Sequence, residues 1–532
     1  MHPIIIGAGH NGLTAAFYLA KAGLQPLVLE QSETIGGGAI TSELCPGFRC
    51  PTLTHHVSLR SDITADMQLA RRGVEFLEPP VEAFAPAIDS PPVVIYRDQG
   101  RTMEALRAVH AKDAQAYATY RASLDDVCRV LTSLLAAPAP SVGEPDMRDI
   151  WNLLKAGRQF RALGARKAHA LLRWAPMPVA DLASEWFESD VLRAIVAAPG
   201  LSGTMFGPRS AGSALVLLLS EATRMLSHGC GRVRGGPGAL TQAMADAART
   251  AGADIRTGAR VERLVVKDGR ITGVLAGGRE IAAAAVVSAI DPKTTFLKLV
   301  DPTDLSPDFL SKMRGYRANG TLAKVNLALS GLPSFTGPAF TGPAKAGHYV
   351  HESMEILAGR IHLGPDLDYL ERAFDHAKYG EISSEPWLDV TIPSVLDSTL
   401  SPSGGHVMSI YAHYAPYRLR DAGWPAMKDA LLKCVMSTLE RFAPGVGKLV
   451  LAAEVVTPLD LEERFGYHGG HIFHGEIALD QLASMRPLLG YSRYQSPIPG
   501  LFMCSAGTHP AGFMSGGNGK MAAQQIVEFL AR

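Results

Sequence analysis

The first thirty residues constrain the fold of this chain more than any other stretch. Residues 4–6 form an apolar run that a strand would bury, residues 13–22 have the apolar spacing of a helix, and a second apolar run ends at Glu30. Between the first run and the helix stand three glycines with the spacing Gly-x-Gly-x-x-Gly: Gly7, Gly9 and Gly12. They permit a tight turn, a close approach of the backbone to a pyrophosphate, and close packing of helix on strand. The stretch therefore predicts a βαβ unit that binds a dinucleotide.

The helix after these glycines has the features of an anion-binding helix start. Asn11 is a residue type that caps helices, and Gly23 stands where a C-terminal cap is expected. The unsatisfied N–H groups of the first turn would point at the phosphates. Glu30 ends the second strand, where a carboxylate accepts hydrogen bonds from both hydroxyls of an adenosine ribose. This end of the chain does not show which dinucleotide binds.

The length and charge of the chain exclude several classes of protein. At 532 residues it exceeds the size at which single cores stop growing, so we expect two domains that can be interleaved. Lys plus Arg and Asp plus Glu each number 51, which provides no overall field to attract nucleic acid. The first strand begins at residue 4, and no apolar run reaches the length of about 18 residues that a membrane span needs. We therefore expect a cytoplasmic protein without a leader.

The cysteines do not indicate a disulfide framework or a zinc ribbon, because the sequence contains no Cys-x-x-Cys pair. Cys45 and Cys50 do have the four-residue gap of the redox pair in flavin disulfide reductases. Pro46 and Gly47 place a turn between them, whereas that redox pair lies at a helix start. Two small apolar residues beside a turn are therefore the favoured interpretation, and a redox pair is the alternative.

A basic amphipathic segment lies in the helical middle of the chain. Residues 105–225 carry apolar side chains at spacings of three and four, which predicts helices. Within them, residues 151–174 hold several Lys and Arg and no acid, and Trp151 and Trp174 stand at the two ends. Such a segment can lie at a membrane interface, with its apolar face down and its cations on lipid phosphates. A solvated helix face that covers the core is an equal alternative.

The chain then returns to its first domain. Residues 260–282 are typical of a β-meander, and residues 285–290 form an apolar strand. The nucleotide domain is therefore discontinuous, and the helical block is an insertion. We assign the nucleotide domain to residues 1–85, 228–300 and 491–532, and the substrate domain to residues 86–227 and 301–490.

Two groups of histidines raise the question of proton transfer or metal binding. For the adjacent pair His55 and His56 we favour a polar loop over a proton donor, because histidines without a spaced partner are usually structural. Three others repeat at intervals of three residues: His468, His471 and His474. Three imidazoles on one helix face can ligate zinc, but the glycines between residues 466 and 475 argue against a helix. We therefore expect no metal.

The end of the chain contains a second glycine-rich turn. An apolar run over residues 501–503 leads into residues 505–519, which are rich in glycine, and then into a helix expected over residues 520–530. A helix start favours negative charge. In a flavoenzyme such a start faces the pyrimidine end of the isoalloxazine and stabilises the negative charge that forms there on reduction. Two such helix starts suit a long ligand, so FAD fits, whereas NAD needs only the first.

Five motifs in this order resemble those of the phytoene desaturase-related FAD oxidoreductases. They are Gly7-Ala-Gly-His-Asn-Gly-Leu, Ile35-Gly-Gly, Gly235-Gly-Pro-Gly-Ala-Leu, Gly470-His-Ile-Phe-His-Gly-Glu and Gly507-Thr-His-Pro. The resemblance covers essentially the whole chain. It implies the two-domain α/β fold of amine oxidases and GDP-dissociation inhibitors, in which a Rossmann-like FAD domain is interleaved with a substrate domain and a tunnel leads to the flavin.

The resemblance also implies which residues contact FAD. Glu30 would bind the ribose, Val261 the adenine through its backbone, and the Met514 N–H the flavin carbonyl. One departure is Ala39, because relatives often carry arginine at that position. The complete expected set is Gly7, Gly9, Asn11, Gly12, Glu30, Gln31, Gly36, Gly37, Gly38, Val261, Gly507, Gly512, Phe513, Met514, Gly516 and Gly517.

The expected function is FAD-dependent oxidoreduction. As in desaturases and dehydrogenases, the flavin would take hydride from a hydrophobic substrate of isoprenoid or lipid-like type, with quinone, oxygen or nicotinamide as the electron acceptor. His509 and His474 are candidates for proton handling beside the flavin. Two alternatives stay open. One is an escort protein that keeps the fold without turnover, and the other is an amine oxidase in which Tyr411 and Tyr414 flank the flavin.

Overall fold

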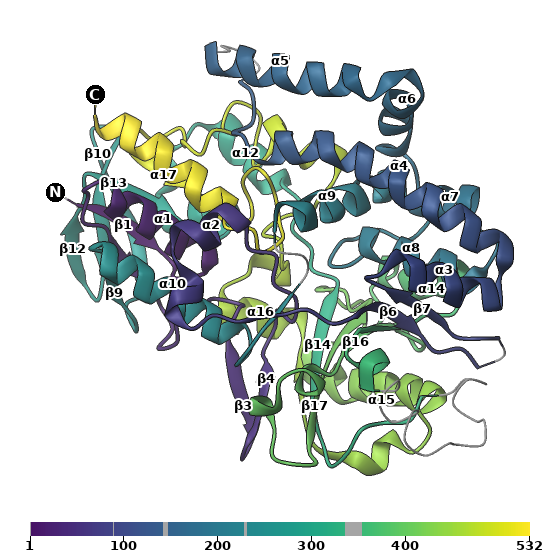
Figure 1. Cartoon of the computed structure of the whole chain (residues 1–532). Helices are drawn as coiled ribbons and strands as arrows, with labels where there is room; N and C mark the ends of the chain where they lie inside the picture. Colours follow the sequence, from purple (N-terminus) through teal and green to yellow (C-terminus); the bar gives the residue numbers. More distant parts are fainter. Residues whose placement is uncertain (1, 89, 142–146, 228–230, 336–353, 532) are drawn as a thin grey trace.

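The computed structural model describes residues 2–88, 90–141, 147–227, 231–335 and 354–531. Two large sheets organise this part of the chain, and helices pack on both (Figure 1). Figure 1 shows the two termini on the left of the view, in the half of the molecule that holds β1 and α17. The other half holds the second sheet and a layer of helices beside it.

A five-stranded parallel sheet forms the core of the half with the termini. β1 (Pro3–Ile6) lies at its centre, and all four of its side chains are buried. Its neighbours are β2 (Leu27–Leu29) and β13 (Ala285–Ser288). β9 (Asp254–Arg256) and β19 (Leu501–Met503) complete the order β19-β13-β1-β2-β9. Strands from three distant parts of the chain are therefore joined in one sheet.

Three helices pack on this sheet and on one another: α1 (His10–Lys21), α10 (Pro237–Ala251) and α17 (Gly517–Leu530). The contact between α1 and α17 depends on glycine. A Cβ on Gly519 would lie 2.1 Å from the Asn11 carbonyl oxygen and 2.9 Å from the Thr14 Cβ. The first turns of the two helices therefore touch.

Both helix starts differ from the sequence prediction. Gly9 is the N-cap of α1 because its backbone is extended there, so Asn11 lies inside the first turn and caps nothing. The last helix begins at Gly517 rather than residue 520, and Gly516 takes the left-handed N-cap conformation with φ of 71°. Each helix thus starts after a glycine that offers no capping side chain.

A seven-stranded sheet forms the other half, in the order β18-β14-β17-β16-β15-β6-β7. All its strand pairs are antiparallel except β15 with β6. The central strands are almost wholly buried, so they carry apolar runs rather than an alternating pattern. The strands are β6 (Val81–Ala85), β7 (Val93–Tyr96), β14 (Leu322–Leu329), β15 (Arg360–Leu363), β16 (Trp387–Thr391), β17 (His406–His413) and β18 (Val450–Val456).

β6 corrects one boundary of the expected domains. The sequence prediction assigns residues 81–85 to the nucleotide domain, but the structure places them in the seven-stranded sheet, parallel to β15. The reason is packing, because Val81 and Phe84 are buried in the core of that sheet. The first segment of the nucleotide half therefore ends before Val81.

Helices from the middle of the chain form a layer beside the second sheet (Figure 1). α4 (Ala111–Leu135) packs along α9 (Ser213–Leu226), and α7 (Val179–Trp186) packs against this pair. α8 (Asp190–Ala197) packs against α7 and β6. Their apolar faces share one core with residues of β6 and β7. These helices lie between β7 and β8 in the sequence.

The basic segment forms two helices on the outside of α4. α5 (Met147–Ala162) and α6 (Gly164–Trp174) lie along the top of Figure 1. Trp151 is 61% exposed, whereas Trp174 is buried against Trp186. The expectation that both tryptophans flank a membrane face is therefore wrong for Trp174. Among the described helices, none is long and apolar enough to cross a membrane.

The remaining elements pack around the two large sheets. The expected meander is confirmed, because β10, β11 and β12 pair antiparallel in that order. The bounds are β3 (Thr41–Cys45), β4 (Phe48–Pro51), β5 (Phe76–Leu77), β8 (Arg232–Val233), β10 (Val261–Lys267), β11 (Arg270–Ala276), β12 (Arg279–Ala282), α2 (Ser61–Asp66), α3 (Gln99–Val109), α11 (Pro292–Thr294), α12 (Pro307–Gly315), α14 (Leu367–Lys378), α15 (Trp424–Phe442) and α16 (Pro458–Phe465).

Candidate functional site

The loop between β1 and α1 has the shape that a pyrophosphate requires. A Cβ on Gly12 would lie 2.1 Å from the Gly7 carbonyl oxygen, so only glycine permits this packing. No described atom beyond the chain neighbours lies within 4 Å of the Cβ position of Gly9, so the space beside Gly9 is open. Because Gly9 is the N-cap, this open space lies at the start of α1, whose N–H groups favour an anion.

Glu30 lies beside this loop at the end of β2 and is 7% exposed. Its carboxylate accepts a hydrogen bond from the Ala8 N–H at 2.7 Å and another from the Ser32 N–H at 2.9 Å. Each carboxylate oxygen thus has one backbone donor and a lone pair left for a ribose hydroxyl. The Glu30 carbonyl accepts from the Ala259 N–H, which brings Val261 close to this end of the site.

The segment from Gly36 to Gly38, which we call the glycine crossing, runs directly over the loop between β1 and α1. Gly36 forms a parallel bridge with Gly9, and the Gly36 N–H donates to the Ala8 carbonyl oxygen at 3.1 Å. The Gly38 N–H donates to the Tyr467 hydroxyl at 2.9 Å. A side chain at Gly38 has no room, because that hydroxyl lies 2.6 Å from the Cβ position. The glycine crossing is therefore fixed at one end by the loop between β1 and α1 and at the other end by Tyr467.

The loop before α17 is tied together by Asn518. This residue is fully buried, and its Nδ2 lies 3.0 to 3.1 Å from the carbonyl oxygens of Ser505, Thr508 and His509. Met514 lies in the same loop and is buried. The loop is therefore fixed by the chain itself at the start of the second helix.

The other expected cofactor residues lie around the two helix starts. A Cβ on Gly507 would lie 2.5 Å from the Pro292 Cδ, and one on Gly512 would lie 2.6 Å from the Phe473 Cδ1. Both positions thus require glycine. Gln31 is exposed after Glu30. The same turn and helix start also hold Phe513, Gly516 and Gly517.

These residues fit FAD. Three buried polar atoms at the two helix starts have no hydrogen-bond partner within the described chain: His10 Nε2, Asn11 Oδ1 and Asn518 Oδ1. Buried polar groups are nearly always hydrogen-bonded, so their position indicates a polar ligand. Burial lowers the pKa of His10 to about 4, which keeps its imidazole neutral. The open space at Gly9 would take the pyrophosphate and Glu30 the ribose.

A cavity of about 320 Å³ extends from this region into the helical layer. That volume is in the range of small-molecule sites. Of the expected cofactor residues, Gly38, Phe513 and Met514 line it. Apolar side chains of the helical layer line much of the rest, including Tyr117, Tyr120, Leu124, Ile195, Val196 and Leu217.

Charged side chains also reach the wall of this cavity. Glu221 forms ion pairs with Arg121 at 3.4 Å and Arg224 at 2.9 Å, and Arg224 lies 3.9 Å from Glu82. Burial alone would raise the pKa of Glu221, but the two arginines hold it below its usual value. We refer to these four residues as the Glu221 network.

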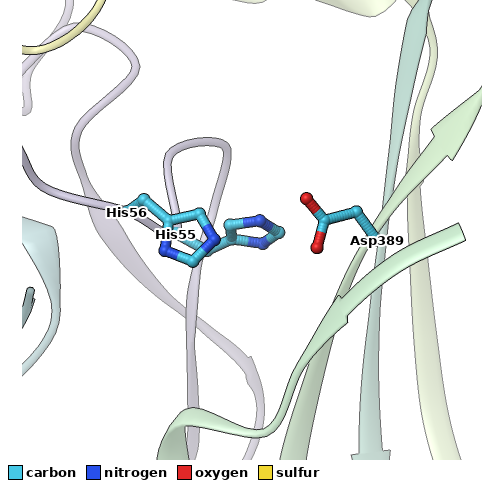
Figure 2. Close-up of side chains that lie close together, drawn as sticks. All are labelled: His55, His56 and Asp389. Carbon is cyan, nitrogen blue, oxygen red and sulfur yellow. The ribbon is translucent and has the colours of Figure 1, made fainter. Parts of the chain in front are cut away.

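A second polar group lies where the loop after β4 meets the seven-stranded sheet. Figure 2 shows the rings of His55 and His56 close together, with the Asp389 carboxylate facing them. A nitrogen of each histidine and an oxygen of Asp389 all lie within 4.8 Å of one another. Lys324 Nζ lies 3.0 Å from His55 Nδ1 and donates a hydrogen bond to the Ser409 hydroxyl. The pair does lie in a loop, but both rings belong to a largely buried network rather than to a solvated surface.

Positive charge dominates this histidine cluster. Lys324, Arg232 and Arg360 all act on Asp389, yet burial outweighs them and raises the pKa of that carboxyl. Burial lowers the pKa of Lys324 to about 7. Burial and the same cations hold the pKa of both histidines well below the usual range, so the imidazoles are neutral. The three ligand atoms have a spacing that a metal could use, but the cations oppose it.

Neither histidine expected to handle protons is among the described residues that line the cavity. His509 Nε2 lies 3.2 Å and 3.0 Å from the carbonyl oxygens of Leu134 and Ala137, and burial lowers its pKa to about 4. His474 packs against the Tyr467 ring, and burial lowers its pKa to about 3. His509 is thus held by the chain itself, whereas His474 Nδ1 has no hydrogen-bond partner among the described residues, and a proton-handling role for either stays a prediction. The histidines that line the cavity are His10 and His56.

Tyr411 and Tyr414 do not act as a pair. Tyr411 lines the cavity and lies over the His55 ring, with ring centroids 3.9 Å apart. The Tyr414 hydroxyl donates to the Phe206 carbonyl oxygen, and its ring packs on Phe374. Tyr414 is absent from the described lining of the cavity, so only Tyr411 of the two faces the site. The aromatic pair suggested for an amine oxidase is therefore wrong.

Cys45 and Cys50 lie on adjacent strands of the β3–β4 hairpin, and both are free thiols. Burial raises the pKa of Cys50 to about 12, which keeps it a thiol at neutral pH. The structure therefore supports the interpretation of two small apolar residues beside a turn. Cys230 lies outside the described residues.

The comparisons with known proteins agree with this site. The family model described as DAO, FAD dependent oxidoreductase, matches residues 3–398. The chain therefore belongs to the FAD-dependent oxidoreductase family, and FAD is its cofactor. The expected fold class is confirmed, because a Rossmann-like parallel sheet carries the glycine loop.

Three relatives match nearly the whole chain. Pyridine nucleotide-disulfide oxidoreductase domain-containing protein 2 of Rattus norvegicus is 33% identical over 99% of this chain and 93% of its own length. A limonene dehydrogenase polypeptide of Castellaniella defragrans is 24% identical, with coverage of 99% and 94%. Phytoene desaturase (lycopene-forming) of Pantoea ananas is 25% identical, with coverage of 99% and 99%. The resemblance predicted from the five motifs is therefore confirmed.

Two solved structures share the fold. An oxidoreductase from Methanosarcina mazei superposes with a TM-score of 0.61 at 15% identity, covering 99% of this chain and 100% of its own. Cyclohexylamine oxidase from Brevibacterium oxydans superposes with a TM-score of 0.59 at 14% identity, covering 100% and 99%. Identities this low show the fold alone.

Sequence reasoning missed Lys324, Arg360 and Asp389. A signal for two of them exists, because Lys324 and Asp389 are charged residues inside otherwise apolar strands, β14 and β16. A charge in such a strand is rarely buried without a purpose, so it marks a candidate site. Arg360 opens a short strand and carries no comparable signal.

Lys324 gives a testable dependence of stability on pH. On folding, burial lowers its pKa from 10.5 to about 7. Between those values the unfolded chain holds a proton that the folded chain has released, so stability rises with pH there. We expect the free energy of unfolding of wild type, relative to Lys324→Met, to increase as the pH is raised from about 7 to 10.5. Urea unfolding at a series of pH values measures this difference.

The matched control for this measurement is Lys433→Met on α15, which removes the same side chain from an exposed position. Its difference from wild type should stay flat over the same interval. A flat difference for Lys324→Met as well would contradict a buried amine that releases its proton on folding.

Proposed function

We propose that this enzyme oxidises a hydrophobic substrate of isoprenoid or lipid-like type by hydride transfer, as a dehydrogenase or desaturase. The observation that carries the proposal is the cavity, which joins apolar walls to the cofactor region at Gly38 and Met514. A substrate lodged against Leu124 and Leu217 would have a direct path to that region. Burial of apolar surface stabilises by roughly 25 cal/mol per Å², so these walls favour a hydrophobic body.

Two relatives support this substrate class. The limonene dehydrogenase polypeptide and phytoene desaturase are named for isoprenoid hydrocarbons, and both match nearly the whole chain. The match extends over the helical layer as well as the nucleotide half, so it includes the segments that wall the cavity.

The residues of the chain position the substrate and the cofactor, limit the access of water and place charge near the flavin. FAD, when bound, accepts the hydride. The start of α17 directs its N–H groups to the cofactor region, where negative charge is then stabilised. α4 and α9 form part of the cavity wall, and their apolar residues Leu124 and Leu217 reduce the access of water to a bound substrate. Lys324 Nζ and His55 Nδ1 lie 3.0 Å apart behind the residues that line the cavity, and they can share a proton.

Anaerobic reduction of the FAD-loaded protein tests this proposal. We expect an isoprenoid probe, limonene or geraniol, to bleach the visible flavin band, and the amine probe cyclohexylamine to leave it unchanged. Bleaching by the amine and by neither isoprenoid would overturn the proposal in favour of an amine oxidase. Quinone and oxygen are the proposed acceptors, and the one that restores the band faster in the reduced protein is the acceptor used.

A variant of the cavity wall sharpens the same test. Leu124→Trp on α4 fills part of the cavity, so it should slow reduction about tenfold or more while FAD content stays the same. Leu134→Trp is the matched control, because Leu134 lies on the same helix and its side chain is exposed. Equal rates for the two variants would show that the cavity does not hold the substrate.

We also propose that α5 rests on an anionic membrane surface. Four apolar residues recur along it at helical spacing and are exposed: Met147, Ile150, Trp151 and Leu154. Four cations on α5 and α6 form no ion pair with any described residue: Lys155, Arg158, Arg161 and Arg166. An apolar helix face with unpaired cations favours lipid headgroups and the upper acyl region. Lys167 and Arg173 are paired with Asp126 and Glu185 and do not contribute.

Co-sedimentation with vesicles of phosphatidylcholine and phosphatidylserine tests the membrane proposal. The double variant Trp151→Ser, Leu154→Ser should lose most of its binding, by about fivefold or more, because it removes the centre of the apolar face. The control is Leu451→Ser, which removes an exposed leucine from β18. Undiminished binding of the double variant would exclude α5 as the contact.

A further inference from the structure

Arg360 is a charged group of the cavity wall that forms no hydrogen bond with any described residue. Arg360 at the start of β15 lines the cavity, and its side chain is 17% exposed. Within the described chain its ion-pair partner is Asp389, and the distance of 3.8 Å from Nε to Oδ1 is too long for a hydrogen bond. A guanidinium has five N–H donors in a planar fork. This fork is therefore available to a ligand that enters the cavity.

Two further cations lie behind Arg360. Arg232 is buried, and its Nη2 donates to the carbonyl oxygen of Gly359 at 3.1 Å, next to Arg360 in the chain. Its Nη1 has no partner among the described residues. Lys324 is fully buried and acts on the same carboxylate, Asp389. Arg360 and Arg232 thus face one carboxylate as two charged groups, and Lys324, whose pKa is lowered to about 7, lies beside them. Because unbalanced buried charge is costly, the group favours an incoming anion.

The other arginines of the cavity are already engaged. Arg121 and Arg224 belong to the Glu221 network. Arg97 Nε donates to the Pro79 carbonyl oxygen at 2.8 Å, and its Nη1 lies 3.7 Å from a Glu78 oxygen. Arg360 is therefore the arginine of the cavity that is placed to bind a ligand.

We propose that Arg360, supported by Arg232 and Lys324, binds a carboxylate group of the substrate. This inference rests on the proposed function and deepens it, because the same cavity holds the apolar body of the molecule. An arginine fork and a carboxylate form two parallel charge-assisted hydrogen bonds, which fix the orientation of the bound molecule. The substrate class is then a lipid-like or isoprenoid carboxylic acid with its acid group at Arg360.

The charges of the same cluster disfavour the two competing occupants. A divalent metal at His55, His56 and Asp389 would lie near Lys324 Nζ, which is 3.0 Å from His55 Nδ1, and near the guanidinium of Arg360. A phosphate dianion would bring a second negative charge beside the Asp389 carboxylate. A carboxylate carries a single charge, which balances the one charge by which Arg360 and Arg232 exceed Asp389, whereas a dianion would exceed it.

Calorimetric titration of the FAD-loaded protein with hexanoate, hexanol and hexyl phosphate tests the proposal, and the visible flavin band provides a second reading. We expect hexanoate to bind wild type about tenfold or more tightly than hexanol does. Arg360→Met should weaken hexanoate binding about tenfold or more and change hexanol binding less than about twofold. Arg360→Lys keeps the charge without the fork, so its loss should be intermediate.

Arg97→Met is the matched control, because it removes another arginine of the cavity, one whose Nε donates to the Pro79 carbonyl oxygen and whose ion-pair partner is Glu78 rather than Asp389. It should change hexanoate binding by less than about twofold. Circular dichroism and FAD content are measured for every variant. A wild-type protein that does not retain FAD would contradict the assigned cofactor and the proposed function. Loss of the carboxylate site alone would instead leave the FAD content unchanged and affect only hexanoate binding.

Four results would overturn the proposal. The first is equal hexanoate binding by wild type and Arg360→Met, and the second is equal binding of the acid and the alcohol by wild type. Tighter binding of hexyl phosphate than of hexanoate would assign the site to phosphate esters instead. Stoichiometric binding of Zn²⁺ that is lost in Asp389→Asn would show a metal site. The comparison of acid with alcohol uses wild type alone, so it decides the question even where a variant fails to fold.

Discussion

The structure depends on the contact between two helix starts from opposite ends of the sequence. Gly519 of α17 lies so close to α1 that a Cβ would be 2.1 Å from the Asn11 carbonyl oxygen. The N-terminal ends of two helices carry like partial charges, so their approach is unfavourable unless an anion lies between or beside them. The pyrophosphate of FAD is such an anion. The contact that closes the nucleotide half therefore also defines where the cofactor binds.

The second half of the molecule is joined to this site by buried polar groups. The loop that carries His55 follows the glycine crossing, and Lys324 comes from a central strand of the seven-stranded sheet. Placing a lysine, an aspartate and two histidines in this interior costs stability, because burial shifts their pKa values away from the charged forms. Proteins keep such groups mainly at functional sites. The cavity reaches from this cluster to the cofactor region, so a role in binding the substrate would explain why these buried polar groups are kept despite their cost in stability.

The features that the sequence predicts well are those set by neighbouring residues. The βαβ unit, the place of Glu30 and the terminal glycine turn follow from local spacing, and the family resemblance rests on the same motifs. The failures concern partners that lie far away in the sequence. The pairing of β6 with β15 and the burial of His55 against Lys324 and Asp389 depend on strands hundreds of residues later. The burial of Trp174 is missed at short range, because Trp186 lies on another helix and the residue spacing does not show that the two rings meet.

The FAD dissociation constant of Gly519→Ala shows whether the contact between α1 and α17 builds the cofactor site. Calorimetry on the FAD-depleted protein measures it, with Gly157→Ala in α5 as the control, because a Cβ there meets no described atom within 4 Å. We expect Gly519→Ala to weaken FAD binding about tenfold or more, since the added methyl must push α17 away from α1, and the control to bind like wild type. FAD binding at wild-type strength in Gly519→Ala would contradict the claim that this contact builds the cofactor site.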